Sequence, residues 1–376
     1  MLRKATENTY KVALSMLKGA SFDLLSHIRE RDIPLREFFS FPALKLKEAL
    51  GINNNAEFLD ASIRDKAITA ALKEEVFMER HHIRALFVED EDYPHRMAAT
   101  EDPPLMLYML GECDLNAKKV LGVVGTRKIT PYGADCERKI IAELTDYLPE
   151  ICIVSGLAYG ADAIAHTSAL EAGCPTVGVV AHGLDTIYPA GHRDLARRII
   201  KNDGAILTEF PSGTPPYRAR FLQRNRIVAW ITDATLIVES PITGGAMSTA
   251  NHAFNENRDV MAIPGRVYDE MSEGCNHLIR KNKASLVTSA NDIMDLLGWK
   301  ASQGIRPAEV LALFPEMEGN NKIIYDHLRT MQDPVTPDAL RVLTGIPIGL
   351  VISSLTELEF EALVVRHPGN RYSVAR

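Results

Sequence analysis

Four arginines lie within nine residues of this chain, together with one aromatic side chain. They are Arg218, Arg220, Arg224 and Arg226, with Phe221 among them. No aspartate or glutamate occurs between Phe210 and Thr232. A planar guanidinium pairs with phosphate oxygens, and an aromatic ring offers a face on which a nucleobase can stack. A charge run is usually a solvated helix face, but the missing acids favour contact with a nucleic acid.

Three glycine-containing turns follow short apolar runs and could bind an anion. The first is Gly125-Thr126-Arg127, the second runs from Ser155 and Gly156 to Gly160, and the third is Gly244-Gly245. A glycine-rich turn that leads into a helix presents free N–H groups and a positive dipole end to phosphate. The same glycines also suit a tight strand-to-helix turn that only permits close packing. Taken alone, the second turn does not decide between the two.

These turns lack the fingerprints of nucleotide cofactors. The dinucleotide motif GxGxxG does not fit, because three residues separate Gly156 from Gly160, and no turn ends in the GK[ST] of a P-loop. Asp162 and His166 lie four residues apart and could form an acid–base pair, although an ordinary helix-surface or capping pair is commoner. We therefore expect no cofactor, no metal site and no nucleophile triad.

Strand and helix patterns alternate through the middle of the chain. Apolar runs without polar alternation suit strands buried on both faces. Such runs occur at 83–88, 120–124, 151–154, 175–180, 205–208, 234–238, 260–263 and 285–288. Repeated strand–helix units predict right-handed crossovers and an open parallel sheet. The fold class is α/β with an extended Rossmann-like core, and a ligand would lie at the carboxyl ends of its strands.

The ends of the chain predict two smaller domains around this core. Residues 1–75 have helical spacing broken by glycines and prolines, which is typical of a small packing domain and less often of a SAM- or helix-hairpin-helix-like module. The core would span 76–298 and a linker 299–317. Residues 318–376 have the order of a winged helix. Its third helix, from Pro347 to Glu361, has no lysine or arginine, so we expect it to pack or meet a protein rather than read DNA.

Composition limits the class of protein further. The net charge of the 376 residues is −7, so nucleic-acid contact must come from a local patch. The five cysteines are widely spaced, which favours a reduced cytoplasmic compartment. The sequence has no long apolar span of the kind that predicts a membrane helix. The four acids Glu89–Asp92 fit a solvated turn better than a cation site.

Taken together, these residues resemble the DNA-processing protein A (DprA/Smf) family. The match runs from about 82 to 290, with motifs in the family's order. They include Asp102–Pro104, Val124–Arg127, Ser155–Asp162 with His166, Gly183–Pro189, Phe221–Arg226, Ile263–Gly265 and Gly274–Asn276. The resemblance implies a non-enzymatic homodimer that binds single-stranded DNA and loads the RecA recombinase in natural transformation and recombination.

The same resemblance implies a set of DNA-binding residues. They are Gly125, Thr126, Arg127, Ser155, Gly156, Gly160, Arg218, Phe221, Arg224, Asn225, Arg226, Gly244, Gly245 and Asn276. Arg218 stands where the family often has lysine, and Gly244 stands where it usually has serine.

Two rival functions belong to other classes. Related Rossmann-like enzymes hydrolyse nucleoside monophosphates with a GGxGTxxE loop, but His252 occupies the position of the catalytic glutamate here. A DNA-reading regulator would instead act through the C-terminal domain.

Overall fold

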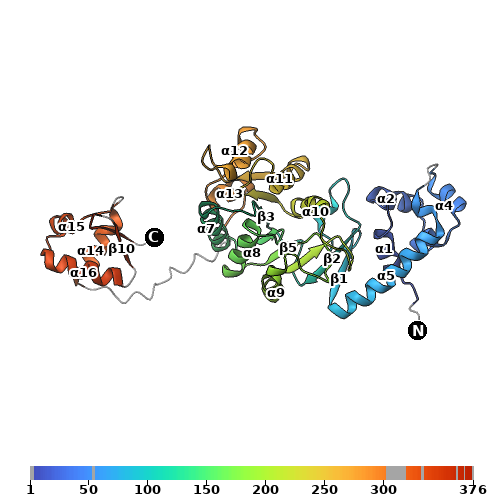
Figure 1. The fold of residues 1–376 in the computed structure, drawn as a ribbon, viewed down its shortest axis with the longest axis horizontal. Coiled ribbons are helices and arrows are strands. Elements are labelled where there is room, and N and C mark those ends of the chain that lie inside the picture. The colour runs from blue at the N-terminus through green and yellow to red at the C-terminus, as the bar shows by residue number, and fades with distance from the viewer. Residues whose placement is uncertain are drawn as a thin grey trace. The chain divides into compact units, whose positions relative to one another are not determined.

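The computed structural model describes residues 4–52, 56–301, 319–331, 334–360, 363–367 and 369–374. The chain divides into two compact units, Met1–Gly304 and Ile305–Arg376. Figure 1 shows the elements of each. The predicted linker 299–317 lies outside the described residues from 302 onward, as does residue 318.

The first unit begins with a module of short helices. They are α1 (Glu7–Ser15), α2 (Phe22–Glu30), α3 (Leu35–Ser40), α4 (Ala43–Leu50), the 3-10 turn η1 (Glu57–Leu59) and the longer α5 (Ala61–His81). Side chains cap several of them: the Thr6 hydroxyl accepts from Thr9 N, and the Ser21 hydroxyl accepts from Leu24 N. The predicted boundary at residue 75 falls inside α5, which continues almost into the first strand.

A fully buried arginine joins the parts of this module. Arg64 of α5 donates from Nε to Phe39 O (3.2 Å) and from Nη1 to the carbonyls of Phe58 and Leu59 (both 2.9 Å). Its Nη2 also donates to Phe41 O. Burial lowers the pKa of Arg64. Four carbonyls, two from the end of α3 and the residue after it and two from η1, thus converge on one guanidinium, which satisfies backbone groups that the short helices leave free.

A nine-stranded sheet forms the core of the first unit, in the order β1-β2-β6-β5-β4-β3-β7-β8-β9. The strands are β1 (Ile83–Phe87), β2 (Met106–Gly111), β3 (Val120–Val124), β4 (Cys152–Ser155), β5 (Thr176–Val179), β6 (Ala205–Thr208), β7 (Ala234–Ile237), β8 (Asp259–Ala262) and β9 (Ser285–Leu286). From β6 to β9 all neighbours are parallel, while β1 and β2 pair antiparallel at one edge. The predicted Rossmann-like parallel core is confirmed.

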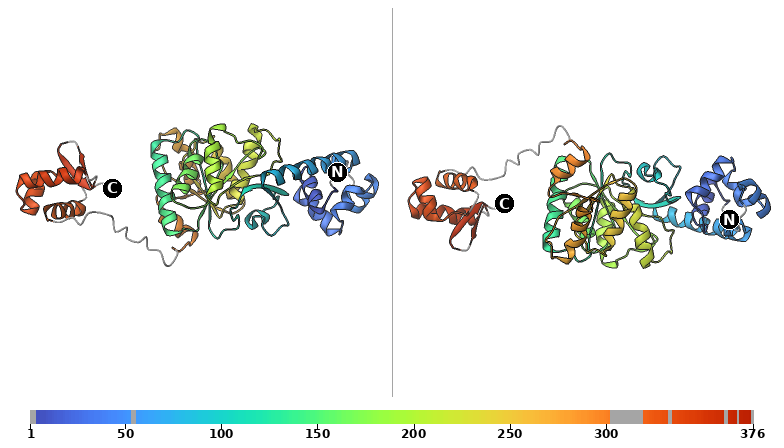
Figure 2. Two further views of the ribbon diagram at one scale, coloured as in Figure 1. Left: turned by 90° about the horizontal axis from the view of Figure 1, so that it is seen from below. Right: turned by 90° about the horizontal axis from the view of Figure 1, so that it is seen from above.

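Helices cover both faces of this sheet (Figure 2). They are α6 (His95–Ala98), α7 (Pro131–Tyr147), α8 (Ala161–Glu171), η2 (Ala190–His192), α9 (Arg193–Lys201), α10 (Arg218–Trp230), α11 (Gly245–Asn255), η3 (Glu270–Ser272), α12 (Glu273–Arg280) and α13 (Ala290–Leu297). Alternate residues of β3 show the two layers: Leu121 and Val123 join the core under α7, α8 and α13, whereas Val120 and Val124 join the core that includes α10 and α11. Burial on both faces explains the unbroken apolar runs.

The acidic turn after β1 is exposed at Glu89, Glu91 and Asp92, so the predicted solvated turn is confirmed. Asp90 accepts from Phe87 N, and Glu89, Asp90 and Asp92 form surface ion pairs with arginine or lysine side chains.

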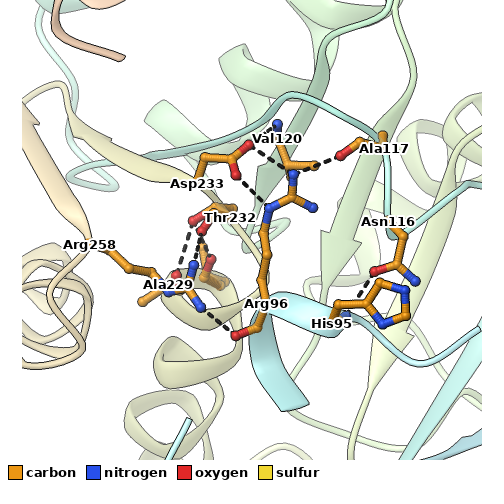
Figure 3. A network of polar contacts seen from close by, with 10 residues as sticks. His95, Arg96, Asn116, Ala117, Val120, Ala229, Thr232, Asp233 and Arg258 are labelled. Carbon is orange, nitrogen blue, oxygen red and sulfur yellow. Dashed lines mark hydrogen bonds and ion pairs between the residues drawn. The ribbon is translucent and has the colours of Figure 1, made fainter. Parts of the chain in front are cut away.

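A polar network links α10 to the amino ends of β3 and β7 (Figure 3). The Asp233 carboxylate accepts from Arg96 Nε (2.6 Å) and from Val120 N (2.8 Å). Arg258 donates to Thr232 O (2.8 Å) and to the carbonyl of Arg96. Because Thr232 and Asp233 connect α10 to β7, this network fixes the carboxyl end of α10 at the amino ends of β3 and β7.

Replacing Asp233 with alanine should lower the free energy of unfolding by about 2–4 kcal/mol, because it leaves a mostly buried arginine without its carboxylate. Urea unfolding measures the change. Asp135→Ala is the matched control, since it breaks the exposed Asp135–Arg138 pair and should change stability by less than about 1 kcal/mol. Equal losses in the two variants would contradict the role of the network.

The second unit is a separate small domain with its own core. It contains α14 (Gly319–Thr330), α15 (Pro337–Thr344), α16 (Ile348–Phe360), β10 (Val364–His367) and β11 (Arg371–Val374). Ile324, Leu340 and Leu355 contribute to one apolar cluster. On α16, Ile352 and Phe360 are exposed beside Glu357 and Glu359, whereas Glu361 lies outside the described residues. This is the predicted winged-helix order.

Candidate nucleic-acid interface

The carboxyl ends of the central strands bring the three glycine turns together. β3 lies between β4 and β7 in the sheet, so the turn after β3 has the other two as neighbours. The chain leaves β3 toward β4 on one side and reaches β7 on the other, which makes this a topological switch point. Ligands of open α/β sheets bind at such points.

Backbone hydrogen bonds interlock the three turns. Thr126 N donates to Glu239 O after β7 (2.7 Å), and Ala161 N donates to Thr126 O (3.2 Å). Gly160 has a φ of +76°, and a Cβ there would lie 2.3 Å from Thr126 O. Only glycine permits this approach. Arg127 directly follows Thr126, so its position depends on the turns after β4 and β7.

The side chain of Glu239 fixes the other end of the Arg127 turn. Its Oε2 accepts from Thr130 N (2.8 Å), and its Oε1 accepts from the Thr130 hydroxyl (2.6 Å). A Cβ at Gly133 would meet this carboxylate at 2.5 Å. A negative group at the amino end of α7 also complements the helix dipole.

Arg127 and three aromatic rings surround a small hollow. The Arg127 guanidinium lies over the Phe221 ring at 5.6 Å, and the Phe221 and Tyr188 rings are 5.7 Å apart. The aromatic hollow, about 40 Å³, is lined by Arg127, Gly156, Ala158, Tyr159, Tyr188, Pro189 and Phe221. Tyr159 and Tyr188 are each about half exposed, at 51% and 45%. An exposed cation beside exposed rings can bind a phosphate and a stacked base together.

Sequence reasoning missed Tyr159 and Tyr188. Each lies in a stretch that it had singled out, the glycine turn Ser155–Gly160 and the loop Gly183–Pro189. An aromatic residue at the tip of a loop near a phosphate turn was the available signal. Tyr159 packs edge-on to His192 at 4.7 Å, and the His192 ring bonds Leu157 O (2.8 Å), which anchors the wall of the hollow.

Arg224 lies beneath the hollow, not in its wall. Its side chain is 5% exposed, and a Cβ at Gly156 would lie 1.7 Å from its Nη1. Burial lowers the pKa of Arg224, while the nearby Asp162 charge opposes that shift. Its Nε has no hydrogen-bond partner among the described residues. Arg224 therefore supports the second glycine turn from below, with the Asp162 carboxylate as its neighbouring charge.

Two of the other three arginines of α10 have partners of their own. Arg226 pairs with Glu209 at 2.5 Å and lies over Trp230, so it serves packing between α10 and the β6 end. Arg220 donates to Pro215 O and lies over the Tyr217 ring. Arg218 is exposed at the first turn of the helix. Of the four, Arg218 is the one left most open to a ligand.

The remaining candidate residues support the turns. The Ser155 hydroxyl donates to Val123 O (2.6 Å), and Asn225 Nδ2 donates to Gly245 O (3.2 Å), which links α10 to the third turn. A Cβ at Gly244 would meet Ser240 Oγ at 2.2 Å, so a side chain there would require the Ser240 hydroxyl to move. Asn276 bonds Gly265 O and N (3.1 and 3.3 Å) and orders the loop after β8, outside the hollow.

His166 does not pair with Asp162. Its Nδ1 bonds the Thr176 hydroxyl (2.7 Å), which itself donates to Ile153 O (2.7 Å), so the ring nitrogen carries the hydrogen. Burial lowers the pKa of His166 to about 3. Asp162 instead accepts from Ala158 N (3.1 Å) inside the second turn. The acid–base alternative is wrong in this geometry, and both side chains hold the fold.

Two family models match this chain. The model of DNA recombination-mediator protein A matches residues 84–298, and that of the DprA winged helix domain matches residues 316–370. The chain belongs to the DprA/Smf family. The protein Smf of Synechocystis is 31% identical over 98% of both chains, and the DNA processing protein DprA of Streptococcus pneumoniae is 36% identical over 65% of this chain and 89% of its own.

Solved structures of DprA relatives agree with this fold. The X-ray structure of DprA from Streptococcus pneumoniae matches with a TM-score of 0.64 and 30% identity, covering 78% of this chain and 98% of that one. A DprA structure from Helicobacter pylori, which describes a single-stranded DNA binding mode of that protein, matches with a TM-score of 0.51 and 29% identity, covering 57% and 95%. The aromatic hollow lies inside the matched DprA core.

Two features are absent from the described ranges of the chain. No group of three or more histidine, cysteine, aspartate or glutamate side chains in those ranges could hold a metal ion. In the same ranges no single helix is long and apolar enough to cross a membrane, although α15 and α16 together, bent by 115°, meet the criteria of length and composition.

The buried His166 should make the stability of this DprA chain sensitive to acid. Its folded pKa of about 3 lies below the ordinary 6.5, so between these values the unfolded state binds the extra proton. The free energy of unfolding should therefore fall by about 1.4 kcal/mol for each pH unit from 6.5 down to 3. Urea unfolding of the wild type and of His166→Gln across this range isolates the slope, because their carboxylates are the same. If the free energy of unfolding fell equally with pH in both proteins, His166 would not be the source of the slope.

Proposed function

We propose that this chain binds single-stranded DNA, protects incoming or exposed single strands, and loads a RecA recombinase onto them in natural transformation and DNA recombination. One observation carries the DNA contact: the Arg127 guanidinium rests on the Phe221 ring beside Tyr188, at the switch point of the sheet. The family and the Helicobacter pylori relative support the same ligand.

The size of the aromatic hollow favours a strand over a small substrate. Pockets that enclose small molecules usually hold about 300–1,000 Å³, whereas this hollow holds about 40 Å³. A nucleotide cannot be enclosed there. A base can lie on the exposed rings while its phosphate meets Arg127 and the glycine N–H groups, and a strand repeats that contact along its length.

The remaining candidate residues take graded roles in this proposal. The residues proposed to contact the DNA directly are Gly125, Thr126, Arg127, Gly156, Gly160, Arg218, Phe221, Gly244 and Gly245. We infer that Ser155, Arg224, Asn225, Arg226 and Asn276 act by holding those groups in place. The contact belongs to the core, 76–298, and the modules at 1–75 and 318–376 are attached to it.

Catalysis is not part of the proposal. His252 packs edge-on to Trp230 at 6.2 Å, and burial lowers its pKa. An imidazole held neutral against an indole does not replace the carboxylate of a nucleoside hydrolase. Incubation with nucleoside monophosphates, followed by chromatography, should release no free base; release would overturn this choice.

We also propose a homodimer and contact with RecA, as the family resemblance implies. The winged-helix domain would serve such protein contacts, because α16 exposes Ile352 and Phe360 beside two glutamates. An apolar surface with acids suits a protein partner better than a phosphate backbone.

Arg127→Ala should weaken binding of a thymidine oligonucleotide by roughly tenfold and reduce the slope of log affinity against log salt by about 0.7, because one phosphate contact is lost. Fluorescence anisotropy across a salt series gives both values. Arg138→Ala removes an equal charge from the exposed surface of α7 and should bind like wild type. Indistinguishable behaviour of the two variants would refute the proposed interface.

Phe221→Ala and Tyr188→Ala should each weaken binding by roughly tenfold with little change in the salt slope, because stacking carries no charge. Phe221→Trp should keep most of the affinity. Quenching of 2-aminopurine placed in the oligonucleotide reports the stacking directly. If Phe221→Ala still quenched 2-aminopurine fully, Phe221 would not be the ring on which the base stacks.

Removing residues 318–376 should leave most of the affinity for single strands, since the second unit has its own core. The measurement is the same anisotropy titration with the shortened chain. Loss of binding would favour the DNA-reading regulator over this proposal.

A further inference from the structure

A buried glutamate of the N-terminal module reaches a loop of the core. Glu74 lies on α5 and is 6% exposed. Its Oε1 accepts from Ser212 N (2.9 Å), and its Oε2 accepts from the Ser212 hydroxyl (2.5 Å). Ser212 lies 138 residues later in the sequence, between β6 and α10. Both carboxylate oxygens are thus used on a single residue of another element.

Such a contact restrains the loop strongly. An ionised carboxylate in a buried place needs hydrogen-bond donors, and bonds to a charged group are stronger than neutral ones. Two bonds to one residue fix direction as well as distance. Glu74 therefore determines where the backbone at Ser212 can lie.

The helix that carries Glu74 is itself fixed to the sheet. α5 ends at His81, and β1 begins at Ile83, so one residue separates them. β1 pairs with β2, and β2 pairs with β6, the strand that precedes Ser212. Figure 1 shows α5 running to β1. The carboxylate is therefore held by the same sheet whose loop it restrains.

The restrained loop joins the two aromatic walls of the hollow. Next to Ser212, Gly213 N donates to Asp185 Oδ1 (2.7 Å), and Thr214 O accepts from Gly183 N (3.0 Å). Asp185 and Gly183 begin the loop that carries Tyr188. Five residues after Ser212 the chain reaches Tyr217 and then α10, which carries Arg218 and Phe221.

A histidine continues the connection to the backbone of Tyr188. Tyr188 N donates to His182 Nε2 (3.1 Å), so Nδ1 carries the ring hydrogen and bonds Gly183 O (2.9 Å). His182 is fully buried. The path from Glu74 to Tyr188 thus consists of hydrogen bonds joined by short stretches of backbone.

We propose that Glu74 is a positioning residue for the single-strand site, through which the N-terminal helical module sets the spacing between the Tyr188 loop and α10. This inference rests on the proposed function. It assigns the module a role in DNA binding without contact with the DNA.

The test compares Glu74→Ala with Glu74→Gln in the full chain, using an oligonucleotide that contains 2-aminopurine. Glu74→Ala should weaken binding roughly tenfold, because a charged hydrogen-bond pair is lost. It should also reduce the quenching measured with the variant saturated by DNA. Glutamine can still accept from Ser212 N and donate to its hydroxyl, so Glu74→Gln should recover most of both signals.

Glu75→Ala is the matched control. Glu75 is the next residue of α5, and its carboxylate accepts from the Thr9 hydroxyl inside the module (2.9 Å). This variant should keep wild-type affinity and quenching. Quenching at saturation reports the geometry of the bound state, so a loss of stability alone does not change it.

Ser212→Ala covers the case in which Glu74→Ala does not fold, since it removes one bond and leaves the backbone contact. It should weaken binding by a smaller factor in the same direction. Wild-type affinity and quenching in Glu74→Ala, or in Ser212→Ala if the former is unfolded, would overturn the inference. Arg127→Ala in the same series separates the two claims: if it also binds like wild type, the proposed DNA interface itself is wrong.

Discussion

Two backbone hydrogen bonds place the turn after β3, and the candidate interface depends on them. Thr126 donates to the carbonyl of Glu239 and accepts from Ala161 N, so the turns after β4 and β7 hold it from both sides. The Rossmann-like order puts β3 between β4 and β7 in the sheet. A different strand order would separate the three turns. Arg127 would then have no fixed relation to the aromatic rings.

The electrostatics of the interface follow from this arrangement rather than from overall charge. The chain is acidic as a whole, with a net charge of −7. Around the hollow, however, Arg127 is exposed, Arg218 begins α10, and Arg224 lies buried under the glycine turn. Two nearby acids are turned inward: Asp162 accepts from Ala158 N, and Glu239 accepts from Thr130. A local positive surface can thus exist on an acidic protein.

The sequence was sufficient to predict the class of fold and the three turns, because apolar runs and glycine positions are local signals. It predicted the arginine run of α10, but not that one of these arginines is buried, two have partners and one is exposed. Whether an arginine is open or buried depends on partners far along the chain, such as Glu209 for Arg226 and Gly156 for Arg224. Tyr159 and Tyr188 were missed for the same reason: their meeting with Phe221 depends on how separate loops pack. The contact of Glu74 with Ser212 left no pattern in the sequence.

The position of Arg127 over Phe221 has a consequence for selectivity between ligands. In the free protein the guanidinium already occupies part of the ring face that a base would use. A free base must displace it and gains only stacking in exchange. In the proposed function, a phosphate would draw the same guanidinium away from the ring and uncover the face for the base that follows. In the proposed function, the cation and the ring therefore favour binding of a phosphate joined to a base over binding of either group alone.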